Sequence, residues 1–241
     1  MLYIYIYVFS KLSFLPRYLG GGASMHDLHI QYRIGHSTIS LIVREVCSAI
    51  WNEMKSKCFP ELTPEFWLNT AAEFMARTNF PHCLGALDGK HIRVIKPTDS
   101  GSLNFNYKKF FSILLLAICD DNYKFLFVDV GAYGKSSDST VFKMSVFQKK
   151  LLDSSLNIPK PRNVGVGVNE NLPFMFVADE GFGQSQFILR PYGGKCWHDS
   201  GDIYLWCLKF CDSLLLHPSA CLALLPCFFY VQSRVLFVLC C

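Results

Sequence analysis

The stretch CLGALDGKHIRVI, residues 83–95, decides the fold, because it is typical of a β-strand that carries a carboxylate near its middle. Two largely apolar segments flank Asp88-Gly89-Lys90-His91, and two further apolar segments follow at 110–119 and 125–130. Between those two, the short polar sequence Asp120-Asp121-Asn122 is typical of a hairpin turn. We therefore expect three antiparallel strands in this part of the chain.

A helix and a fourth strand are expected next. Residues 139–152 predict one amphipathic helix, whose inward side chains are Val141, Phe142, Val146, Phe147 and Leu151. Residues 173–178 predict a strand that ends at Asp179, and residues 185–189 predict a further helix or turn. Three antiparallel strands, then a helix crossing to a strand beside the first, is the ribonuclease H-like arrangement. The predicted fold class is therefore α/β (α+β), a mixed sheet with flanking helices.

The region before the sheet predicts helices. Residues 24–57 favour two helices around Gly35, and residues 64–78 favour a third that begins at Pro64. The second helix has one apolar face, formed by Ile39, Ile42, Val43, Val46 and Ile50. Two helices around a Gly-containing turn are typical of a helix-turn-helix, with Arg33 and Arg44 as candidate DNA contacts. A plain helical hairpin packed on the core explains the same spacing.

Two carboxylates occupy comparable places on the first and fourth strands, Asp88 within the first and Asp179 at the end of the fourth. If these strands are neighbours, the two acids converge and repel each other unless a cation lies between them. Oxygen ligands favour Mg²⁺ or Mn²⁺, and a pair of such ions can activate water against a phosphodiester. Taken singly, Asp88 is explained as a turn cap and Asp179 as a helix N-cap, whereas together they favour a metal site. Asp138 is either a helix N-cap or a further acid of that site.

Six strings are more specific than this spacing: NFPHCLGALDGKHI (79–92), FNYK (105–108), VDVGAYG (128–134), SDSTVF (137–142), FVADEGF (176–182) and RPY (190–192). In this order they resemble the catalytic domain of the PIF/Harbinger-type transposases and of the nucleases derived from them. The string IGHSTIS (34–40), followed by EVC (45–47), resembles the region upstream of that domain. The resemblance extends over about residues 17–195.

The resemblance implies a DDE superfamily endonuclease with a ribonuclease H-like core, which cuts DNA with Mg²⁺ or Mn²⁺. Asp88 matches the first catalytic aspartate of that family, Asp179 the second, and Asp138 another acidic position of the pattern. In this interpretation Lys90 or His91 contacts phosphate or orients a ligand. Members of the family act with a separate Myb-like protein that supplies DNA recognition. We expect the nucleus as the location, with the cytoplasm second.

The third catalytic acid of the family is a glutamate on a later helix, and no such residue is found here. The family pattern stops after Lys195, and residues 196–241 contain no glutamate. Glu180 is not expected to substitute, because neighbouring side chains on a strand end diverge. We therefore expect a C-terminally truncated member of the family with weak or absent cleavage.

The ends of the chain differ in composition from its middle. Of 241 residues 51% are hydrophobic and 17% charged, with a formal charge of +4, which excludes intrinsic disorder. Seven of the 11 cysteines fall in residues 196–241: Cys196, Cys207, Cys211, Cys221, Cys227, Cys240 and Cys241. The other four have no metal-ligand spacing and suit reduced thiols. Zinc is disfavoured even at Cys207 and Cys211, because no paired CxxC accompanies them.

These observations predict four regions: an apolar segment 1–23 without the features of a secretory signal, a helical region 24–78, an incomplete endonuclease core 79–195, and a Cys-rich apolar tail 196–241. The leading hypothesis is a metal-dependent DNA endonuclease. One alternative is a catalytically inactive relic that binds DNA or protein through helices 24–57. A second is a membrane protein anchored by the uncharged residues 213–233, which Pro218 and Pro226 disfavour as a helix.

Overall fold

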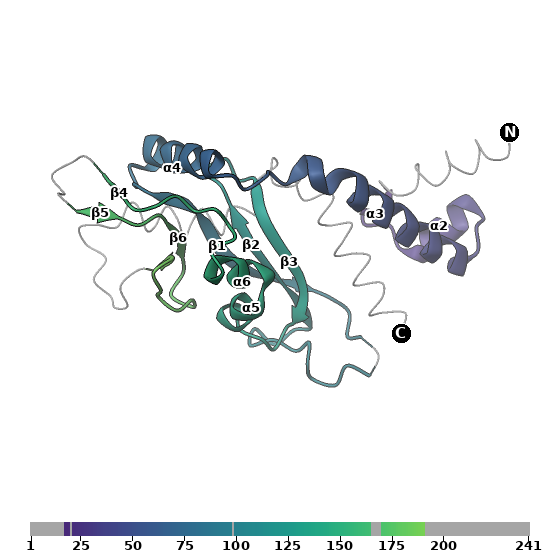
Figure 1. The fold of residues 1–241 in the computed structure, drawn as a ribbon. Helices are drawn as coiled ribbons and strands as arrows, with labels where there is room; N and C mark the ends of the chain where they lie inside the picture. Colours follow the sequence, from purple (N-terminus) through teal and green to yellow (C-terminus); the bar gives the residue numbers. More distant parts are fainter. Residues whose placement is uncertain (1–16, 20, 98, 165–169, 191–241) are drawn as a thin grey trace, which may run out of the picture. The chain divides into compact units, whose positions relative to one another are not determined.

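The computed structural model describes residues 17–19, 21–97, 99–164 and 170–190 (Figure 1). These residues fall into two compact units, one that ends at Lys57 and one that begins at Cys58.

The first unit is built on two helices, α2 (Met25–Tyr32) and α3 (His36–Cys58). Ser24 and Asp27 cap α2 reciprocally: the backbone N–H of Asp27 donates to the Ser24 hydroxyl, and that of Ser24 donates to the Asp27 carboxylate. The unit has its own apolar core, formed by Leu28, Ile39, Ile42, Val43 and Cys47. Val46 and Ile50 pack against it, so the apolar face predicted for the second helix is confirmed.

The second unit is built on a five-stranded mixed sheet (Figure 1). Its strands are β1 (Cys83–Arg93), β2 (Ser112–Cys119), β3 (Phe125–Tyr133), β6 (Met175–Ala178) and β7 (Ile188–Leu189), in the order β3-β2-β1-β6-β7. β1 is antiparallel to β2 and β2 to β3, whereas β6 pairs in parallel with β1. The predicted ribonuclease H-like arrangement is therefore confirmed. The short strands β4 (Arg162–Asn163) and β5 (Asn171–Leu172) form a separate antiparallel pair.

Three helices accompany this sheet: α4 (Pro64–Thr78), α5 (Asp138–Met144) and α6 (Val146–Leu152). The prediction of one helix over 139–152 was wrong, because the chain breaks at Ser145. That residue has extended backbone, and its buried hydroxyl accepts from the Gln148 N–H at 3.1 Å, so it caps α6 instead of continuing α5. The predicted helix or turn at 185–189 is a turn at Ser185 followed by β7.

Aromatic side chains join α4 and α6 to the sheet. Trp67 of α4 lies edge-to-face on Phe176 of β6, with 5.7 Å between ring centroids, and Phe147 of α6 lies on the same ring at 5.4 Å. The indole N–H of Trp67 donates to the carbonyl of Leu156 at 2.7 Å. Burial of each such ring stabilises the fold by roughly 2–3 kcal/mol. The strand that precedes Asp179 is therefore held by packing from two helices.

The C-terminal end of α4 is fixed to the β2–β3 turn by Arg77. Its Nε lies 3.2 Å from the carboxylate of Asp121, which is 2% exposed, and its Nη1 donates to the Asp121 carbonyl at 2.8 Å. Its Nη2 donates to the side chain of Asn122 at 2.7 Å. Within the turn, the Asp120 carboxylate accepts from the N–H groups of Asn122 and Lys124. These two acids thus serve the fold.

No helix in the described part of the chain is both long and apolar enough to cross a bilayer. The segment 213–233, for which an anchor was the second alternative, lies outside the described residues.

Candidate active site

The register of the sheet places Asp88 and Asp179 at corresponding positions. Leu87 of β1 pairs with Ala178 of β6, so each acid is the next residue after a paired position on two parallel neighbouring strands. Each carboxylate accepts from a nearby backbone N–H: Asp88 from Gly89 at 2.7 Å, and Asp179 from Gly181 at 2.9 Å. No helix follows Asp179 within residues 180–190, so its interpretation as a helix N-cap was wrong.

Asp138 is the first residue of α5, and its interpretation as the N-cap was also wrong. The cap is Ser137, whose hydroxyl accepts from the Thr140 N–H at 3.3 Å. The carboxylate of Asp138 lies directly against Gly89, because a Cβ added there would be only 2.5 Å from Oδ1 of Asp138. That Oδ1 is buried and has no hydrogen-bond partner among the residues described. The third acid therefore packs on the backbone next to the first.

The electrostatics connect Asp138 to the other strand end as well. Burial raises the pKa of Asp138, and the negative charge of Asp179 raises it further. The ammonium of Lys108 acts in the opposite sense and lowers that pKa. Asp138 thus interacts electrostatically with both Asp179 and Lys108, and it contacts Gly89, the residue after Asp88. Three acids from three separate elements are brought to the same part of the sheet.

These acids do not form a closed ligand set. Within the described ranges, no three His, Cys, Asp or Glu side chains lie close enough to hold one metal ion. The alternation of side chains along β1 accounts for this, because Asp88 leaves the strand on the face opposite to Gly89 and Asp138. The buried carboxylate oxygen and the repulsion between Asp138 and Asp179 nevertheless fit a hard divalent cation. The residues present fit part of such a site.

Lys90 and His91 follow the first acid along β1. By the same alternation, Lys90 lies on the face of Asp88 and His91 on the face of Gly89. Nδ1 of His91 lies 3.0 Å from the Ser112 hydroxyl, and its ring meets Tyr107 edge-on at 5.5 Å. Burial lowers the pKa of His91, and Lys108 lowers it further. His91 is therefore neutral near pH 7.

Lys108 is a residue of the site that the sequence did not predict. Its charge lowers the pKa of both Asp138 and His91, so Lys108 is within electrostatic reach of these two residues. It belongs to the string FNYK, which contributed to the family resemblance, although that string alone indicates no role. Residues 94–111, between β1 and β2, show no helical or strand periodicity in the sequence that would have located it.

The predicted DNA contacts Arg33 and Arg44 belong to the first unit, whereas the acids belong to the second. Arg33 is exposed at the end of α2, where it adopts the left-handed conformation with φ 52°. Arg44 is half-buried within α3. His36, Ser37 and Thr38, at the start of α3, are exposed.

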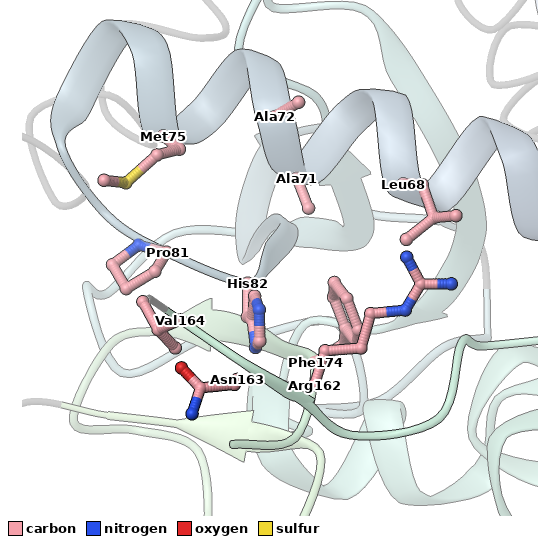
Figure 2. A pocket seen from close by; sticks show the side chains of 10 residues that line it. All are labelled: Leu68, Ala71, Ala72, Met75, Pro81, His82, Arg162, Asn163, Val164 and Phe174. Atoms are coloured by element: carbon pink, nitrogen blue, oxygen red, sulfur yellow. The ribbon is translucent and has the colours of Figure 1, made fainter. Parts of the chain in front are cut away.

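A cavity of about 260 Å³ in the second unit is separate in its residues from the acids (Figure 2). One wall is apolar and comes from Leu68, Ala71, Ala72 and Met75 of α4. Across from it, the ring of His82 stacks on Phe174 with 4.2 Å between centroids, and Arg162 and Asn163 contribute polar groups. None of Asp88, Asp138 and Asp179 lines it.

Comparison with known proteins gives one family and one relative. Residues 87–202 match the family described as DDE superfamily endonuclease. The "Protein ALP1-like" of Arabidopsis thaliana is 28% identical over 182 residues, which cover 74% of this chain and 43% of that protein. The chain thus spans less than half the length of this relative. No solved structure matches.

Proposed function

We propose that this protein is a metal-dependent endonuclease that hydrolyses phosphodiester bonds of DNA, because residues 87–202 match the DDE superfamily endonuclease family and the sequence resembles the Harbinger-type, transposase-derived proteins. The observation that carries the proposal is the half-buried Asp138, whose Oδ1 is fully buried. Its Oδ1 has no hydrogen-bond partner in the described part of the chain, its pKa is raised by burial and by Asp179, and it touches the residue after Asp88.

The carboxylates of Asp138 and Asp179, which repel each other, would hold Mg²⁺ or Mn²⁺, and Asp88 would complete the set once its side chain turns from the opposite face of β1 toward them. When bound, such an ion lowers the pKa of a coordinated water and stabilises the charge that develops on a phosphodiester. The residues of the chain contribute the rest. Gly89 lets Asp138 approach β1, and the Gly181 N–H orients Asp179. The ammonium of Lys108, beside Asp138, attracts the phosphate.

We further propose that cleavage is slow. Residues 181–241 contain no glutamate, and Glu180 itself is exposed beside Asp179. With fewer carboxylate ligands, a two-metal site is stabilised less. The Myb-like partner and the nuclear location implied by the family resemblance are part of the same proposal.

The test is a nicking assay on supercoiled DNA with the full chain in Mg²⁺, in Mn²⁺ and in EDTA. Asp88→Ala and Asp179→Ala are each expected to reduce the rate by at least about 100-fold. Asp153→Ala is the matched control, because this carboxylate is exposed at the end of α6 and contacts none of the acids. It should keep the rate within about twofold. Cleavage that persists in Asp88→Ala or in EDTA would refute the assignment.

The first unit favours a second candidate, a DNA-binding module in a protein that does not cleave. The observation for it is a helix-turn-helix-like pair with its own core, in which His36, Ser37 and Thr38 are exposed at the start of α3. In that case DNA affinity falls steeply with salt, and Arg33→Ala with Arg44→Ala reduces the slope. Affinity that is unaffected by salt and by these substitutions would exclude it.

A further inference from the structure

The loop of residues 103–111, between β1 and β2, is held in place by buried amide groups. Asn104 and Asn106 are each 3% exposed, and Ser112 is fully buried. Asn106 Nδ2 donates to the Ser112 hydroxyl at 2.9 Å, and Asn106 Oδ1 accepts from the Phe110 N–H at 3.2 Å. The backbone N–H of Ser112 donates to the Asn104 carbonyl at 2.7 Å. Satisfied buried networks of this kind fix one conformation.

Gly134, the residue after β3, packs closely against the backbone of Asn104 and Ser112. A Cβ at this position would lie 2.5 Å from the backbone oxygens of Asn104 and Ser112. Backbone atoms cannot rotate away, so only glycine fits. The buried side of the loop is therefore rigid, and the side chains on its exposed side are held in a fixed geometry.

The exposed side of the 103–111 loop has large aromatic and apolar side chains that are accessible to solvent. Tyr107 is 76% exposed, Leu103 47% and Phe105 42%. A cation accompanies each of three rings: Lys108 lies 5.4 Å from the centroid of Tyr107, Arg93 4.5 Å from that of Phe110, and Lys96 5.7 Å from that of Phe111. Phe110 and Phe111 are half-buried, so Tyr107 with Lys108 is the most exposed of these pairs. An exposed ring with cations around it is typical of surfaces that bind single-stranded nucleic acid.

The positive charge of residues 90–111 also favours binding of nucleic acid. Residues 90–111 contain five cations, Lys90, Arg93, Lys96, Lys108 and Lys109, against the single acid Asp99. This surplus, five minus one, equals the formal charge of +4 of the whole protein. Lys90 lies on the opposite face of β1, and the other four cations belong to the loop or to its flanks. A polyanion is the partner that such a surface attracts.

The loop also adjoins the acids. Lys108 acts electrostatically on Asp138, and Tyr107 contacts the edge of His91, three residues after Asp88. A strand that lies on the loop would therefore lead to the carboxylates.

We propose that the 103–111 loop binds an unpaired DNA strand next to the acids, with a base stacked on Tyr107 and the adjoining phosphates on Lys108 and Arg93. The strand must be unpaired because, within a duplex, the faces of its bases are covered by their neighbours. This inference rests on the proposed function, which it deepens by naming the state of the substrate.

The test measures binding of the full chain in EDTA, where no cleavage occurs, by anisotropy of a labelled oligodeoxynucleotide as a single strand and as a duplex. The single strand should bind at least about tenfold more tightly than the duplex, since base stacking on an aromatic ring contributes that much per base. Tyr107→Ala should remove most of this preference, and Tyr107→Phe should keep it. Lys108→Ala should weaken the binding of both forms and lower the salt slope by about one.

Two variants serve as matched controls. Leu152→Ala removes an apolar side chain that is 64% exposed on α6, and Lys150→Ala removes an exposed cation from the same helix. Both should leave the preference for the single strand unchanged. A 2-aminopurine base in the strand should change its emission on binding to the native chain and not to Tyr107→Ala.

Equal affinity for single strand and duplex, or an unchanged preference in Tyr107→Ala, would overturn the inference. A protein partner on this surface would give that result. Its failure is separable from failure of the proposed function. A chain that prefers single strands but never nicks DNA refutes the nuclease alone, and a chain that nicks DNA with no role for Tyr107 refutes the inference alone.

Discussion

Replacement of Gly89 by alanine tests whether Asp138 must lie directly against β1. The added Cβ would be 2.5 Å from Oδ1 of Asp138 and 2.9 Å from its Cβ, both shorter than real contacts of this kind. Rotation of the Asp138 side chain relieves the first overlap but not the second, because that Cβ is fixed to the first turn of α5. Either α5 or β1 must therefore shift.

The magnitude follows from two opposing terms. Overpacking of a well-packed site costs about 1–3 kcal/mol. Alanine in place of glycine within a strand returns about 0.5–1 kcal/mol, because the unfolded chain loses less freedom. The middle values of these two ranges leave a net loss of about 1 kcal/mol, which corresponds to a fall in Tm of about 2–4 °C for a domain of this size. Displacement of a carboxylate by about 1 Å lowers the cleavage rate by about 100-fold.

The assay is thermal unfolding in EDTA together with nicking in Mg²⁺. Gly183→Ala is the matched control, because its added Cβ meets no atom within 4 Å and should change neither readout. Asp138→Gly should restore most of the stability lost in Gly89→Ala, with a coupling energy of about 1 kcal/mol between the two sites. If Gly89→Ala melts and cleaves like the native chain, Asp138 is not held against β1 and the site described above is wrong.

Three further predictions concern the fold and its pH dependence. Arg77→Ala should lower the free energy of unfolding by about 2–4 kcal/mol in urea, since the Asp121 carboxylate, 2% exposed, loses its ion pair; an unchanged value would contradict the clamp on the turn. Trp67→Phe should cost about 1–2 kcal/mol, because the carbonyl of Leu156 loses its donor, and a loss below about 0.5 kcal/mol would exclude that bond. Burial, with Asp179, raises the pKa of Asp138, so its ionisation destabilises the metal-free protein as pH rises through the raised pKa. The Tm advantage of Asp138→Asn in EDTA should therefore be larger at pH 8 than at pH 4, and a difference independent of pH would count against the shift.

The strand order was predictable because its determinants are local in the sequence. Alternating and continuous apolar segments mark β1, β2, β3 and β6, and the Asp120-Asp121-Asn122 turn forces β2 and β3 to pair. The break at Ser145 was not found, because the apolar pattern runs through it without interruption. A signal did exist, since Ser145 and Gln148 have the spacing of a capping box, and a buried hydroxyl on a backbone N–H decided the outcome.

The site was only partly predictable for a different physical reason. The positions of Asp88 and Asp179 follow from strand order, because neighbouring parallel strands that end together bring their next residues together. Tyr107 and Lys108 lie in a loop whose conformation depends on Asn106 and other side chains that meet only in three dimensions. No periodicity encodes such a network.

The aspartates of the second unit fall into two groups: those that stabilise the fold and those that need a ligand. Asp120 accepts two backbone N–H groups, and Asp121 is paired with Arg77, so folding alone explains both. Asp138 is different: its Oδ1 is buried and has no hydrogen-bond partner in the described residues, and Asp179 adds repulsion. A buried carboxylate in that state opposes folding, and an asparagine or an apolar residue would fill the same space at lower cost. A divalent cation between the acids would reverse the sign of both contributions, which is why we expect the metal-free chain to be stabilised by Asp138→Asn and the metal-bound chain to be destabilised by it.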